Sequence, residues 1–193
     1  MKILSFIFVY SFFYISVYSQ NISNQVKFKD IPIKGCLDEM IEKIKSLDYK
    51  FEEKSEDGSV AIFRGSFANE DCEIVLYASP KTKIMHSVIV NFKERHNWHS
   101  LKSKYQELKK QLMTKYNSTP KSREYFIDPY YEGDGYEIQA LKLGKCYYFS
   151  TFNFYNGKIG LYIIEDKIQL LYQDFEGYEI NKKEENEKSY DDL

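Results

Sequence analysis

Apolar residues recur at helical spacing in two stretches of the chain. The first stretch follows Gly35 and carries Asp38 and Glu39 in its opening turn, where the helix dipole favours acidic side chains. The second follows Asn97, whose side chain can cap a helix, and ends before Pro120. We therefore predict two amphipathic helices. Six side chains of their apolar stripes are expected to be buried: Leu37, Ile41, Ile44, Leu101, Leu108 and Leu112.

Alternating apolar and polar residues predict strands on both sides of the second helix. The ranges before it are 26–33, 59–67, 72–78 and 83–92, and those after it are 122–127, 136–143, 145–155, 158–164 and 167–175. The Asn156-Gly157 pair is the strongest hairpin signal, because both central residues of a type I′ turn need positive φ. Short connections of this kind favour antiparallel pairing.

This order of elements predicts an α+β protein in which two helices pack on one face of an antiparallel sheet. A helix followed by strands occurs twice, so we expect two tandem helix-plus-three-strand units, at about 26–95 and 96–180. A chain of 193 residues suits one domain of ordinary size, which we place at 20–180.

The repeated order resembles the tandem helix-and-sheet architecture of beta-lactamase-inhibitor-protein-like proteins, whose two halves align their sheets into one curved surface. The resemblance covers most of 26–175 and rests on element order, so it carries over no functional residue. The chain is also similar to exported α+β proteins of Gram-negative anaerobes, in which an opening such as FKDIPIKG, a helix and a later segment like PYYEGDGYE recur. That resemblance implies export, and it offers no activity that could be assigned to this chain.

The two ends of the chain differ from the region between them. Residues 1–19 have the pattern of a secretory signal peptide, with Lys2 before an apolar run and with Val17 and Ser19 at the positions that a signal peptidase reads. The run is shorter than the roughly 20 residues that cross a bilayer. We expect a secreted or periplasmic protein that starts at Gln20 and is not inserted in a membrane. The charged, aperiodic segment 181–193 is expected to be disordered.

Tyrosine is frequent in this chain, which contains 18 Tyr and 14 Phe. Tyrosine suits half-buried sheet surfaces, and exposed aromatic faces also bind proteins and sugars. The formal net charge is −2, without the basic excess typical of nucleic-acid-binding proteins. Cys36, Cys72 and Cys146 allow at most one internal disulfide, and no histidine lies near any of them in sequence to generate a nucleophilic thiolate.

The stretch DPYYEGDGYE, residues 128–137, concentrates the candidate site residues. Its aromatic and acidic side chains are Tyr130, Tyr131, Tyr136, Asp128, Glu132, Asp134 and Glu137. Four interpretations remain open: a structural loop shaped by proline and glycine, a recognition surface, a calcium site built from carboxylates, and a pair of catalytic acids as in glycoside hydrolysis. Of these, we carry forward recognition, with no catalytic residue assigned.

Histidine gives a weak metal signal. His96 and His99 flank Trp98 at a spacing that can place two imidazoles on one side of a helix start, and Glu94 is close enough to be a third ligand. A helix cap at Asn97 with solvated histidines explains the same residues. We therefore predict no metal and no cofactor.

Taken as a whole, the pattern indicates an exported soluble module that is not an enzyme. We expect it to recognise a protein or peptide through an aromatic-rich sheet face and the 128–137 loop, and not to bind nucleic acid. The alternative is an extracytoplasmic carboxylate-dependent hydrolase. A broad, shallow aromatic face would favour the first function, and a deep pocket with several ionisable groups would favour the second.

Overall fold

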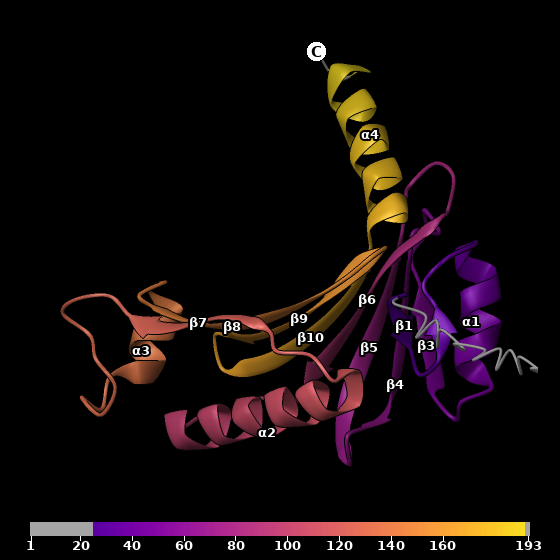
Figure 1. Cartoon of the computed structure of the whole chain (residues 1–193). Helices are drawn as coiled ribbons and strands as arrows, with labels where there is room; N and C mark the ends of the chain where they lie inside the picture. Colours follow the sequence, from indigo (N-terminus) through magenta and orange to yellow (C-terminus); the bar gives the residue numbers. More distant parts are fainter. Residues whose placement is uncertain (1–24, 192–193) are drawn as a thin grey trace, which may run out of the picture.

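Within residues 25–191, which the structure (a computed structural model) describes, the chain builds an eight-stranded antiparallel sheet, a small hairpin and four helices. The sheet order is β3-β4-β5-β6-β10-β9-β8-β7 (Figure 1). Its strands are β3 (Lys50–Lys54), β4 (Val60–Phe67), β5 (Glu70–Ala78), β6 (Met85–Phe92), β7 (Lys121–Phe126), β8 (Cys146–Phe154), β9 (Gly157–Ile164) and β10 (Lys167–Asp174). The hairpin strands are β1 (Lys27–Phe28) and β2 (Ile31–Pro32), and the helices are α1 (Leu37–Lys45), α2 (Trp98–Tyr116), α3 (Glu137–Lys142) and α4 (Phe175–Asp191). The predicted α+β class with an antiparallel sheet is confirmed.

One face of the sheet forms the core together with α1 and α2. Five side chains, one from each of five adjacent strands, lie in register across this face and are all fully buried: Phe63, Ile74, Val90, Leu170 and Leu161. The six helix side chains predicted to be buried are buried in the same cluster. Figure 1 shows α2 beneath the strands of the second half and α1 beside β3 and β4.

The predicted cap of α2 is confirmed, because the Asn97 side chain accepts a hydrogen bond from the Ser100 backbone N–H at 2.8 Å. The helix ends at Tyr116, before Pro120, because Asn117 adopts the left-handed conformation that closes a helix. The position of α2 is therefore fixed by local signals at both ends.

Two strand predictions are wrong in detail, and one strand was not predicted. Range 136–143 contains the helix α3, which residues of high helix propensity form and which buries Ala140 and Leu141. Range 26–33 is a hairpin rather than one strand, since Lys29 and Asp30 both have positive φ. The edge strand β3 was not predicted, because its five residues are all exposed and lack an apolar face.

The turn between β8 and β9 also differs from the prediction. Phe154 pairs with Gly157, so Gly157 is the first residue of β9 and the turn is made by Tyr155 and Asn156. Glycine is required here by space, because a Cβ would overlap the carbonyl oxygen of Gln173. The Asn156 side chain holds this corner by donating to Asp174 at 2.9 Å.

The charged segment expected to be disordered from residue 181 is helical as far as Asp191, as part of α4. Three features hold α4 to the turn 79–84 and to β6: Asn181 and Glu184 are buried, and Gly177 lies so close to β6 that a Cβ would overlap the carbonyl oxygen of Met85. Figure 1 shows α4 leaving the end of β10 on the side opposite α2. Tertiary contacts thus order a segment whose composition alone does not.

The predicted signal peptide lies outside the described residues. In the part of the chain that is described, none of the helices combines the length and the apolar character needed to cross a bilayer.

Candidate functional site

The 128–137 loop is organised by its own carboxylates. Asp134 accepts the backbone N–H of Tyr131 at 3.0 Å and that of Tyr136 at 2.7 Å. Glu137 is buried and accepts the backbone N–H of Gly133 at 2.8 Å. These bonds shape the loop into a compact turn, as side-chain-to-backbone hydrogen bonds do in Asx turns.

Glu132 ties the loop to the helix-covered face of the sheet. Its carboxylate pairs with Lys102 and accepts hydrogen bonds from Trp98 Nε1 at 3.5 Å and from the Tyr148 hydroxyl at 3.3 Å. The hydrogen bond and charge of Lys102 hold the pKa of Glu132 below its usual range. An ionised glutamate fits anchoring and does not fit a general acid, which must be protonated near neutral pH.

The three loop tyrosines divide into two kinds. Tyr131 and Tyr136 are 65% and 58% exposed, whereas Tyr130 packs against the core. All three line a shallow hollow of about 380 Å³ with Pro129, Asp134 and Gln139. Asp128 is exposed at the start of the loop. Among the described residues, the four loop acids do not form a group of three that could hold a metal ion.

A second surface is the sheet face opposite α1 and α2, which we call the open face. Two rows of side chains cross it in register over β4, β5, β6 and β10. One row is polar and consists of Arg64, Glu73, Asn91 and Gln169. The next is apolar and consists of Ile62, Val75, Ile89 and Leu171. Since α1 and α2 pack on the other face, these two helices do not cover the apolar row, although Val75 within it is buried and α4 contacts β6 and β10.

Four rings, which we call the aromatic patch, continue the open face over β7, β8 and β9. Tyr125 stacks on Tyr147 with ring centroids 5.2 Å apart, and Phe149 stacks on Tyr162 at 6.1 Å. The Tyr162 ring lies close to Gly160, where any Cβ would overlap it. Tyr147, Phe149 and Tyr162 line a shallow hollow of about 360 Å³. Sequence reasoning expected an aromatic face, and alternation within 145–155 was the signal that could have identified Tyr147 and Phe149.

A larger hollow of about 970 Å³, which we call the charged groove, lies at the β3–β6 and β10 part of the open face. It is lined by charged side chains of both signs: Lys50, Arg64, Asp71, Glu73, Glu94, Lys93 and Lys167. Within it, Asn91 donates to Glu73 at 3.3 Å and Gln169 donates to Asn91 at 3.0 Å. The groove therefore offers both hydrogen-bond donors and acceptors close to the apolar row.

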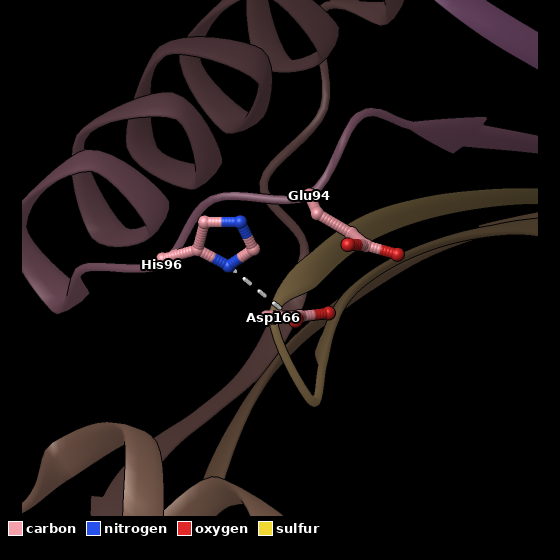
Figure 2. A group of neighbouring side chains, drawn as sticks. All are labelled: Glu94, His96 and Asp166. Carbon is pink, nitrogen blue, oxygen red and sulfur yellow. Dashed lines mark ion pairs between the residues drawn. The ribbon is translucent and has the colours of Figure 1, made fainter.

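Histidine is placed differently from the sequence expectation. His96 lies with Glu94 and Asp166, and His96 Nδ1 is 3.8 Å from an Asp166 carboxylate oxygen (Figure 2). His99 does not belong to this group. Asp166 comes from the turn between β9 and β10, and nothing in its local sequence signals the proximity to His96. His86 is buried between the rings of Tyr77 and Tyr178, where burial lowers its pKa.

Two of the three cysteines lie in surroundings that make a thiol unreactive. All three are free, and Cys72 and Cys146 are buried. Burial raises the pKa of Cys72 to about 11 and that of Cys146 to about 12, so both remain thiols at neutral pH.

No family model, curated protein or solved structure matches the chain.

Proposed function

We propose that the protein is a binding module that takes a protein or peptide segment on its open face. The observation that carries this proposal is the aromatic patch, two stacked ring pairs on a face that α1 and α2 leave uncovered. Partly exposed aromatic rings beside an apolar row are typical of interaction surfaces, where such rings contribute much of the binding energy.

The charged groove adds polar recognition to this surface. Arg64 and Glu73 can pair with groups of opposite charge on a ligand, while the row of Ile62, Ile89 and Leu171 contacts its apolar side chains. This combination suits a peptide or protein surface that carries both charged and apolar side chains.

The 128–137 loop is the second surface of the proposal. Tyr131 and Tyr136 offer exposed ring area, although Glu132 attaches the loop to the helix-covered side of the sheet. The loop and the aromatic patch can therefore act independently, and an experiment must test them separately.

A carboxylate-dependent hydrolase is the weaker candidate. Glu132, Asp134 and Glu137 already bond to groups of the protein itself, and the hollow beside them is shallow. Hydrolysis needs an acid and a base facing one substrate, and the loop presents no such pair among these three.

The proposal includes export and a tandem layout. Export rests on the signal-peptide pattern at 1–19, and N-terminal sequencing of the secreted or periplasmic protein should begin at Gln20. The tandem layout is supported by the strand order, in which β3–β6 and β7–β10 run outward from the central β6–β10 pair. The two halves would then join their sheets into the single face used for binding.

Selection from a random peptide display library tests the function. Peptides enriched on the purified protein should lose at least tenfold affinity when Tyr125→Ser and Tyr147→Ser are combined, because both anchoring rings are gone. Tyr155→Ser is the matched control, since Tyr155 is 93% exposed in the β8–β9 turn and outside the aromatic patch.

A second double variant, Tyr131→Ser with Tyr136→Ser, separates the loop from the face. We call the Tyr125→Ser/Tyr147→Ser protein the face variant and the Tyr131→Ser/Tyr136→Ser protein the loop variant. Wild-type peptide affinity in the loop variant, together with a loss of affinity in the face variant, would assign recognition to the open face. Full binding by the face variant, or the failure of any peptide to be enriched, would overturn the proposal.

A further inference from the structure

We propose that Glu94, His96 and Asp166 form a binding site for a divalent transition-metal ion of the zinc type. Each residue offers one ligand atom, and the three atoms lie within 4.8 Å of one another. Two ligands on a tetrahedral zinc ion are about 3.4 Å apart, because each bond is about 2.1 Å long. In Figure 2 the His96 ring faces the Asp166 carboxylate and the Glu94 carboxylate lies beside Asp166, so binding of an ion would require the three ligand atoms to move closer together.

The backbone holds the two contributing segments together without help from a metal. Glu94 and His96 lie between β6 and α2, and Asp166 lies in the β9–β10 turn. Between them, the backbone N–H of Arg95 donates to the carbonyl oxygen of Asp166 at 2.7 Å. The Arg95 guanidinium pairs with Glu70 of β5, which fixes the segment against the sheet. The backbone positions of the two segments are thus fixed before an ion binds, which lowers part of the entropy cost of binding.

The donor set indicates the class of metal. One imidazole and two carboxylates suit zinc and its neighbours better than calcium, which takes six to eight oxygen ligands. Three protein ligands also leave a coordination position for water or for a group of another molecule. His96 has 80% of its side chain exposed and Asp166 has 20%, so this position faces solvent.

Lys167 competes with the metal for one ligand. Its ammonium group is 3.0 Å from a Glu94 carboxylate oxygen, so it neutralises the negative charge that would otherwise attract a metal ion. A bound ion must displace this lysine or share the carboxylate with it. Removing the ammonium group should therefore strengthen metal binding, whereas loss of a surface ion pair by itself has little effect on stability.

The site borders the charged groove, because Glu94 and Lys167 also line that hollow. A metal ion there would present its open position beside the open face and could receive a carboxylate or imidazole of a ligand. Metal binding by the three residues does not depend on the proposed function and can be tested without a partner.

Calorimetric titration of zinc chloride into the mature, tag-free protein, first treated with a chelator, tests the site. We expect one equivalent of zinc to bind. His96→Ala and Asp166→Asn should each weaken binding at least tenfold, since each removes one of three ligands. His99→Ala is the matched control, because this neighbouring exposed histidine is outside the group, and it should leave the affinity unchanged.

Lys167→Met gives a test with the opposite sign, because we expect several-fold tighter binding. Two-dimensional NMR with cobalt in place of zinc gives an independent readout, in which signals of residues 94–96 and 165–167 should shift or broaden first. Absence of binding, wild-type affinity in both ligand variants, or a loss confined to His99→Ala would each overturn the site. An unchanged or weaker affinity in Lys167→Met would overturn the competition by the lysine.

Discussion

Glu132, Asp134 and Glu137 each connect a different part of the 128–137 loop. Glu132 reaches α2 and β8, Asp134 holds two backbone N–H groups of the loop, and Glu137 joins the start of α3 to Gly133. Buried or half-buried carboxylates are stable only when such donors satisfy them. An acid-rich loop can therefore arise from the demands of its own backbone.

The three loop tyrosines should differ in their effect on stability. Tyr130→Ala should lower the free energy of unfolding by about 1–3 kcal/mol, because its ring packs against the core. Tyr131→Ala and Tyr136→Ala should change it by about 0.5 kcal/mol or less, because their rings are exposed. Urea denaturation of the three variants measures these differences. Equal large losses in all three would show that the whole loop is a structural corner.

At the scale of single elements, one buried carboxylate contributes to the docking of α4. Glu184 accepts hydrogen bonds from the backbone N–H of Lys81 at 2.6 Å and from the Thr82 hydroxyl at 2.6 Å. Burial alone would raise the pKa of Glu184, but these hydrogen bonds outweigh it and hold the pKa below its usual value. The docking of α4 therefore uses the ionised form.

Glu184→Gln should weaken this docking and remove its pH dependence. At neutral pH we expect the free energy of unfolding to fall by about 1.5–3 kcal/mol, the range for hydrogen bonds to a charged group. Because the folded pKa is lowered, the contribution of Glu184 is present above the ordinary pKa of 4.5 and is lost as pH falls through the folded value. Wild type and variant should thus converge in stability as pH falls below 4.5, as measured by urea denaturation at several pH values.

Glu187→Gln is the control, since Glu187 forms a surface ion pair with Lys81 and has 64% of its side chain exposed. This substitution should lower the free energy of unfolding only slightly at any pH. A Glu184→Gln protein that keeps the full acid sensitivity of the wild type would contradict the role assigned to Glu184.

Elements with strong periodicity were predictable from the sequence. The apolar stripes of α1 and α2 and the alternation in β4 to β6 and β8 to β10 mark their positions because each buries one side against the same core. By contrast, α3 is too short for helical periodicity, β3 buries no face, and α4 is ordered by contacts with residues far away in the chain. Local pattern carries no information about such contacts.

The candidate sites were predictable to different degrees. The loop residues and the aromatic character of the sheet followed from composition and alternation. The grouping of Glu94 and His96 with Asp166 did not, because Asp166 lies far from the other two in the sequence and the Arg95 backbone bond to the β9–β10 turn brings them together in the folded protein.

At the scale of the whole molecule, the core is continuous across the central β6–β10 pair. Val90 and Leu170 face each other there, with Ile74 on one side and Leu161 on the other, and all four are fully buried. Neither half of the sheet can lose its packing without exposing the core of the other. The protein should therefore unfold as one cooperative unit.

Two substitutions, Ile74→Ala in one half of the sheet and Leu161→Ala in the other, test the prediction of cooperative unfolding. Each should lower the free energy of unfolding by about 2–5 kcal/mol, the range for such truncations in a core. Both should shift the same single thermal transition, monitored by far-UV circular dichroism and by tryptophan fluorescence. Two separate transitions, each sensitive to only one substitution, would show that the halves unfold independently.

The two edge strands of the sheet carry a further consequence. In β3 all five residues are exposed and four of them are Lys or Glu, and β7 carries the exposed residues Lys121 and Arg123. A strand added to either edge would have to strip water from these charges, so the edges resist pairing with another chain. We therefore expect both sheet edges to disfavour edge-to-edge association between copies of the protein.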